Sequence, residues 1–157
     1  MAKSQFVYGT YVRTTPEKLW DALTKPEITR AYWYGAWHDA KWEPGAPWKL
    51  MAPDGRVADS GEVIETERAR RLVLKWRHEL TAELRAEGYS RCTLDLERFG
   101  DMVKLTTTHE IGKQKSKLLD ALSNGCRQYY RASRACWKLA SHSKRRRNGR
   151  QVAEHAR

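Results

Sequence analysis

Residues 92–109 (CTLDLERFGDMVKLTTTH) decide the fold. Apolar side chains alternate with polar ones on both sides of the turn-forming sequence Phe99-Gly100-Asp101, with Cys92, Leu94 and Leu96 before it and Val103, Leu105 and His109 after it. A period of two residues is typical of half-buried strands, and a short turn between two such runs indicates an antiparallel hairpin. The stretch therefore predicts two neighbouring antiparallel strands.

The sequence on the N-terminal side of this hairpin continues the same pattern. Residues 6–13, 47–51, 56–65 and 72–77 each favour a strand, and Pro53-Asp54-Gly55 favours a hairpin turn. The inward face of 56–65 stays ambiguous because Gly61 interrupts the alternation.

Helical patterns lie at both ends of this strand-rich region. A helix is predicted to begin at Pro16, after a capping box formed by Thr14 and Glu17, and to end at Lys25-Pro26. A second short helix is predicted over 27–32, and helical spacing returns at 118–122. The order is one strand, two short helices, about six strands and then helical sequence. That order indicates an α+β fold in which the C-terminal helix covers an antiparallel sheet.

Size and composition indicate a single domain. The chain has 157 residues, of which 40% are hydrophobic and 31% charged. No apolar run approaches the ~20 residues of a membrane span, and the N-terminus has no apolar stretch of signal-peptide length. Three scattered cysteines do not suggest a disulfide framework or a zinc site. We therefore expect a cytoplasmic protein without a membrane span.

The net charge of +11 is concentrated at the C-terminal end. Residues 1–125 carry 20 Lys and Arg against 18 Asp and Glu, whereas residues 126–157 carry 10 against one. We expect one domain over residues 1–140 and a basic, disordered tail over 141–157. Nucleic acid is expected to bind only non-specifically, through this tail.

Several short motifs carry a family resemblance. In chain order they are TTPEKLWDALT (14–24), YWYG (32–35), GAPW (45–48), DGR (54–56), SGEV (60–63), RLVLKW (71–76) and LTTTHE (105–110). Their order and spacing resemble the helix-grip fold of the START-like (SRPBCC) superfamily. More narrowly, they resemble the bacterial form of the activator of heat-shock protein 90 ATPase homologue family, and the resemblance covers residues 6–125.

The resemblance implies a curved antiparallel sheet around a C-terminal helix, with a cavity between them. It implies binding of a small apolar or amphipathic molecule in that cavity. The alternative is a chaperone-interaction module that acts through its surface, as in eukaryotic relatives. Fold alone does not decide between these functions.

The resemblance breaks at Cys126. Family members continue there with Trp-Pro and a Leu-rich helix, whereas this chain continues with Cys126-Arg127-Gln128. One G inserted into the codon of Cys126 permits a reading that starts Trp-Pro-Ala-Ile-Leu and goes on as a typical family ending. Our hypothesis is that a single-nucleotide deletion produced residues 126–157, and the gene sequence at codon 126 tests it. A product with weak or no activity is then a third functional alternative, and a diverged but selected tail is the other explanation of the segment.

Seven residues are candidates for lining the cavity. Three aromatics lie in the helix-to-strand crossover, which forms one mouth of the cavity in this fold, and four further residues lie on strands; the set is Trp33, Tyr34, Trp37, Trp48, Trp76, His78 and His109. Packing in the core is the competing interpretation of the tryptophans.

The sequence gives little support to metal binding or catalysis. In each of the pairs His78-Glu79 and His109-Glu110 the two side chains point to opposite faces of a strand, so one pair cannot chelate an ion. Neither a nucleophile–base arrangement nor a Gly-rich phosphate loop is recognisable. We therefore predict no metal, no cofactor and no catalytic residue, with both histidines at the cavity wall.

Overall fold

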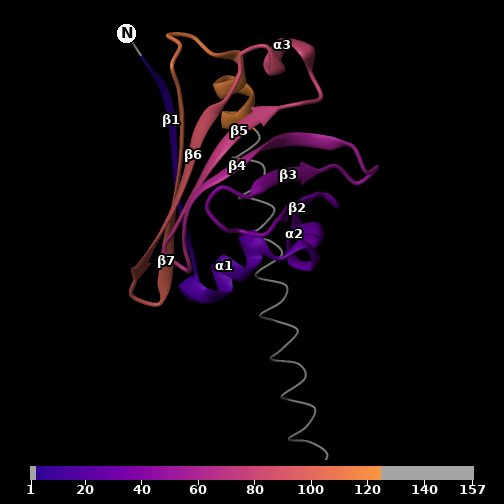
Figure 1. Cartoon of the computed structure of the whole chain (residues 1–157). Coiled ribbons are helices and arrows are strands. Elements are labelled where there is room, and N and C mark those ends of the chain that lie inside the picture. Colours follow the sequence, from indigo (N-terminus) through magenta and orange to yellow (C-terminus); the bar gives the residue numbers. More distant parts are fainter. Residues whose placement is uncertain (1–2, 125–157) are drawn as a thin grey trace, which may run out of the picture.

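The computed structural model describes residues 3–124, which form one seven-stranded sheet with short helices (Figure 1). The strands run in the order β1-β7-β6-β5-β4-β3-β2, and every neighbouring pair is antiparallel. Their bounds are β1 (Ser4–Val12), β2 (Trp37–Ala40), β3 (Pro47–Met51), β4 (Val57–Glu67), β5 (Arg71–His78), β6 (Ser90–Phe99) and β7 (Met102–Ile111). The predicted antiparallel α+β architecture is confirmed.

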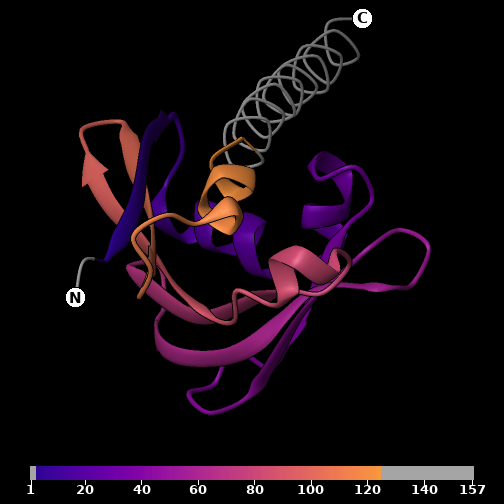
Figure 2. The ribbon, with the colours of Figure 1, turned by 90° about the horizontal axis from the view of Figure 1, so that it is seen from above.

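The sheet is strongly curved, and its concave side holds the helices. Figure 2 shows the strands bending around α1 (Pro16–Thr24) and around residues 117–124, which are helical. Chain order and sheet order agree from β2 to β7, and β1 then pairs with β7 along its whole length. The helix-grip fold predicted from the sequence is therefore present.

The first two helices lie where the sequence predicts them, but the residue that caps the first helix differs from the predicted one. Lys25 ends α1, and Pro26 begins α2 (Pro26–Tyr32). The predicted capping box is wrong, because the N-cap of α1 is Thr15, whose Oγ1 accepts a hydrogen bond from the Lys18 amide at 3.3 Å. Thr15 precedes a proline, which favours the extended conformation that an N-cap needs.

A third helix, α3 (Ala82–Arg85), was not predicted. It has four residues and none of them is buried. A helix this short has no apolar stripe, so it leaves no periodic signal in the sequence.

The core lies between the concave face of the sheet and α1. Alternate residues of the central strands are almost fully buried, and they pack on Leu19, Trp20 and Leu23 of α1. Leu118 and Leu119, from the helical residues 117–124, form a smaller cluster with Ile111. These clusters account for the alternation from which the strands were predicted.

Gly61 marks the place where β4 approaches β5 most closely. A Cβ atom at this position would lie 1.7 Å from the carbonyl oxygen of Lys75, so only glycine fits without a backbone shift. In the sheet Gly61 stands between Trp48 and Trp76, whose ring centroids are 4.3 Å apart. The register of β4 shifts just beyond it, which adds bend to the strand.

Some predictions concern residues outside the described range 3–124. The end of the expected domain at residue 140, the basic tail 141–157 and the altered segment from Cys126 are among them. Within residues 3–124, none of the helices has both the length and the apolar character that crossing a membrane requires.

Candidate functional site

A cavity of about 260 Å³ lies between the concave face of the sheet and the helical residues 117–124. Aliphatic side chains supply much of its wall, including Leu72 and Leu74 of β5 and Leu118 and Leu122 of the helical residues. Aromatic and polar groups complete it: Trp33, Trp42, Trp76, His38, His78, His109, Asp59 and Thr107. The wall is thus apolar, with a few polar side chains at defined places.

Two of the histidines and the aspartate form one row across the sheet. His38 on β2 pairs with Leu50 on β3, Leu50 pairs with Asp59 on β4, and Asp59 pairs with His78 on β5. Directly paired residues point to the same face, and adjacent strands lie roughly 4.8 Å apart, so the row spans roughly 14 Å of backbone. All four residues line the cavity.

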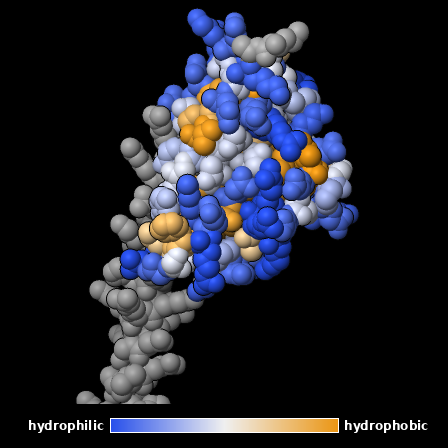
Figure 3. All heavy atoms as spheres, turned by 90° about the vertical axis from the view of Figure 1, so that its left-hand side faces the viewer, coloured by the Kyte–Doolittle hydropathy of each residue, from blue (hydrophilic) through white to orange (hydrophobic). Residues whose placement is uncertain are grey.

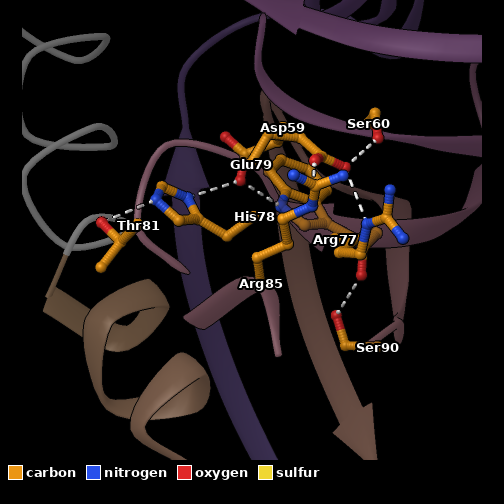
Figure 4. A network of polar contacts seen from close by, with 9 residues as sticks. Asp59, Ser60, Arg77, His78, Glu79, Thr81, Arg85 and Ser90 are labelled. Carbon is orange, nitrogen blue, oxygen red and sulfur yellow. Dashed lines mark hydrogen bonds and ion pairs between the residues drawn. The ribbon is translucent and has the colours of Figure 1, made fainter. Parts of the chain in front are cut away.

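Asp59 is the polar centre of one end of this row (Figure 4). Its carboxylate is buried, and its Oδ1 accepts a hydrogen bond from Trp76 Nε1 at 3.0 Å. The same oxygen lies 3.0 Å from His78 Nδ1, and this hydrogen bond raises the pKa of His78 above its ordinary value. His78 Nε2 lies 3.3 Å from Thr81 Oγ1.

His38 occupies the other end of the row. Trp48 Nε1 donates a hydrogen bond to His38 Nδ1 at 3.0 Å, and the rings of Trp33 and Trp42 meet the imidazole edge-on at centroid distances of 5.3 and 5.5 Å. Burial lowers the pKa of His38 to about 3, so the ring is neutral at physiological pH.

His109 is the third histidine of the wall, on β7. It is only 1% exposed, its ring meets that of Trp76 at 5.5 Å, and burial lowers its pKa to about 4. Its Nδ1 has no hydrogen-bond partner among residues 3–124. This histidine is therefore a packed, neutral part of the core that borders the cavity.

A second polar cluster lies beside this row and does not belong to the cavity wall. Glu79 accepts hydrogen bonds from Ser60 Oγ at 2.5 Å and from Arg77 Nε at 2.7 Å, and Arg85 Nε lies 3.2 Å from its other oxygen (Figure 4). None of these four residues lines the cavity. The cluster ties α3 to the central strands β4 and β5.

The structure brings four of the seven predicted cavity residues together. Trp33, Trp76, His78 and His109 line the cavity.

The other three lie elsewhere. Trp48 is fully buried against Trp76, behind the cavity wall. The ring of Trp37 packs under the guanidinium of Arg30 at 4.0 Å, and Tyr34 is 74% exposed, in a turn with a positive φ of 49°.

Sequence reasoning missed Asp59, His38 and Trp42 as wall residues. Asp59 stands two positions before Gly61 and four before Val63, so strand alternation alone could have placed it on the inner face. His38 gave no such signal, because its strand has only four residues. Within residues 3–124, the titratable side chains do not gather three or more potential metal ligands at one place.

A family model described as "Activator of Hsp90 ATPase homolog 1-like protein" matches residues 13–134. Among solved structures, protein MLL2253 from Mesorhizobium loti superposes with a TM-score of 0.73 at 20% identity, over 87% of this chain and 98% of that chain. PFC0360w, an HSP90 activator from Plasmodium falciparum, has a TM-score of 0.65 at 21% identity, over 80% and 89%. The Aha1 dimer from Colwellia psychrerythraea has a TM-score of 0.63 at 12% identity, over 83% and 93%.

At these identities the structural similarities show the fold alone. No curated protein sequence matches the chain.

Proposed function

Because the chain belongs to the family of activator of Hsp90 ATPase homolog 1-like proteins, we propose that it binds a small apolar or amphipathic molecule in the cavity between the sheet and residues 117–124. The cavity itself carries this proposal. Its volume of about 260 Å³ is many times the ~10–15 Å³ that a single water needs. The cavity is mostly apolar and partly open to solvent, so an apolar molecule that enters it would displace water from its wall, which is favourable.

The aromatic part of the wall supports a flat ligand. Trp33 and Trp42 stand beside His38 at one end, and Trp76 stands beside Asp59 at the other. Aromatic walls with a few placed polar groups are typical of small-molecule pockets. We therefore expect a ligand with a planar apolar body.

A variant that fills the cavity provides the test. Leu94 lines the cavity and is partly buried, so Leu94→Trp should occupy the space with little strain elsewhere. Binding of a fluorescent naphthalene derivative should weaken at least tenfold in this variant, while the melting temperature is kept or raised. Arg98→Trp is the matched control, because Arg98 is exposed on the same strand. Equal affinity in wild type and Leu94→Trp would contradict the proposal.

Activation of a chaperone is the second candidate, favoured by the family description and by the HSP90 activator from Plasmodium falciparum. Seen from the side of β1, the surface is mostly hydrophilic, and its hydrophobic patches are separate (Figure 3). Stimulation of the ATPase of purified Hsp90 tests this candidate. A surface function predicts equal stimulation by wild type and Leu94→Trp, whereas a function that needs the cavity predicts its loss.

A further inference from the structure

We propose that the ligand carries a hydrogen-bond acceptor such as a carbonyl at one end of its apolar body and a hydroxyl at the other, the carbonyl bound by His38 and the hydroxyl by His78. This inference rests on the proposed ligand-binding function and names the chemical class of the ligand. It follows from the hydrogen bonds that Nδ1 of each imidazole makes and from the places of the two residues in the row.

His38 presents a donor to the cavity. The indole nitrogen of Trp48 can only donate, so His38 Nδ1 must accept, and the proton of the neutral ring lies on Nε2. None of residues 3–124 accepts a hydrogen bond from this Nε2. Because its pKa of about 3 keeps the ring neutral, the Nε2–H group is a permanent donor that suits a carbonyl oxygen.

His78 has the opposite arrangement. The carboxylate of Asp59 can only accept, so the proton of neutral His78 lies on Nδ1 and the lone pair lies on Nε2. When His78 is protonated, Nε2 becomes a donor. A hydroxyl group suits both states, because it donates to the neutral ring and accepts from the charged one. A carbonyl suits only the charged ring.

The current partner of His78 Nε2 leaves room for a ligand. The distance to Thr81 Oγ1 is 3.3 Å, slightly longer than the roughly 2.7–3.2 Å of typical hydrogen bonds between nitrogen and oxygen. The side chain of His78 is 20% exposed to solvent, and the residue lines the cavity. A ligand hydroxyl can therefore reach this nitrogen or share it with Thr81.

The row places these two groups at opposite ends of the ligand. Leu50 and Asp59 stand between His38 and His78 on two intervening strands. Leu50 gives the span an apolar floor. The polar groups of the ligand are thus separated by the length of a planar apolar body, which a bicyclic aromatic ring provides.

His109 is 1% exposed, and its Nδ1 is buried without a hydrogen-bond partner among residues 3–124, so a ligand in the cavity does not reach that atom. Thr107, the remaining polar residue of this wall, already has an interaction partner.

Four naphthalene derivatives, each substituted at the two opposite ends of the ring, test the inference. They are ethylnaphthalene, acetylnaphthalene, ethylnaphthol and acetylnaphthol, so the carbonyl and the hydroxyl are added separately and together. Each hydrogen bond should strengthen binding about threefold to tenfold, and acetylnaphthol should bind most tightly. Dissociation constants come from fluorescence titration or calorimetry on the full chain.

Two variants assign the groups. His78→Phe should remove the advantage of the hydroxyl and keep that of the acetyl group, and His38→Phe should do the reverse. Thr81→Val is the matched control, since it keeps His78 and removes only the neighbouring hydroxyl; the advantage of the ligand hydroxyl should persist. If His38→Phe does not fold, the comparison of the four ligands on the wild-type chain still decides.

The outcomes separate the two proposals. If none of the four compounds binds, the proposed function fails, and this inference fails with it. If ethylnaphthalene binds and neither polar group strengthens binding, the cavity function stands and the inference is overturned. An advantage of either group that survives the Phe substitution of its assigned histidine also overturns it.

Discussion

Lowering the pH from 7 to 5 should destabilise this fold by several kcal/mol. The cause is the pair of buried histidines His38 and His109, whose pKa values burial lowers from 6.5 to about 3 and about 4. Below pH 6.5 the unfolded chain takes up a proton on each of these residues, whereas the folded chain does not until the pH reaches the lowered pKa. The stability that these two neutral histidines contribute is therefore complete above pH 6.5, and it is lost as the pH falls toward their lowered pKa values.

The magnitude follows from the size of this window. One pH unit corresponds to about 1.36 kcal/mol for each such group, so the 1.5 units between pH 6.5 and 5 give about 2 kcal/mol for each histidine and about 4 kcal/mol for both. His78 acts in the opposite direction: its raised pKa adds stability at low pH, which is lost as the pH rises through that pKa. The net loss is accordingly somewhat smaller than 4 kcal/mol, yet large beside the ~5–15 kcal/mol of a typical domain.

Urea denaturation at pH 7 and pH 5, followed by tryptophan fluorescence, measures this loss. With a slope of about 2 kcal/mol per molar urea, the midpoint should fall by roughly 2 M. Carboxyl groups with a lowered pKa, such as Glu79 and Glu87, lose their contribution mainly below this window.

The variant His109→Gln separates the contributions. It removes one of the two buried imidazoles. Its free energy of unfolding should therefore fall by about 2 kcal/mol less between pH 7 and pH 5 than that of the wild type. An unfolding free energy that differs by less than about 1 kcal/mol between pH 7 and pH 5 in the wild type would refute the reasoning.

Two further predictions concern single positions of the scaffold. Gly61→Ala should destabilise the domain by about 3 kcal/mol or more, because the new Cβ would meet the backbone of β5 at 1.7 Å. Gly9→Ala is the control: its Cβ would have its nearest neighbour 3.9 Å away, so the free energy of unfolding should change by less than about 1 kcal/mol. Thermal denaturation compares the two variants, and equal effects would contradict the close approach of β4 to β5. Thr15→Ala should lower the free energy of unfolding by about 1 kcal/mol, because it removes the N-cap of α1, whereas Thr14→Ala should leave it nearly unchanged. Chemical denaturation measures both variants, and the reverse order would show that Thr14 is the cap.

The sheet could be predicted because its signals are local. Residues 47–51 and the turn at 53–55 coincide with β3 and the hairpin that follows it. Alternation and turn residues report on each strand by itself, and the period of two is imposed by the burial of one face. The cap of α1 and the four-residue α3 were missed because a one-residue shift and a single exposed turn leave hardly any pattern.

The site was only partly predictable from the sequence, because the register in which the strands pair decides which side chains meet in it. Asp59 lies 21 residues after His38 and 19 before His78 in the chain, and nothing local to any of them indicates that they meet. Their alignment depends on pairings that the hairpins of β2 to β5 set together. Aromatic residues near the crossover were easier to propose, yet composition alone did not distinguish Trp33 at the wall from Tyr34 in solvent.

The dependence on register also explains why the scaffold and the site are linked. A slip of one residue in any of these strands would turn a whole set of side chains to the opposite face, and it would remove His38 or His78 from the cavity. Gly61 opposes such a slip, because the close approach of β4 to β5 is possible only where a side chain is missing. It also lets Trp48 and Trp76 meet across β4, and these are the residues that orient His38 and donate to Asp59. The same glycine that bends the sheet therefore also allows the placement of the two indole groups that hydrogen-bond to His38 and Asp59.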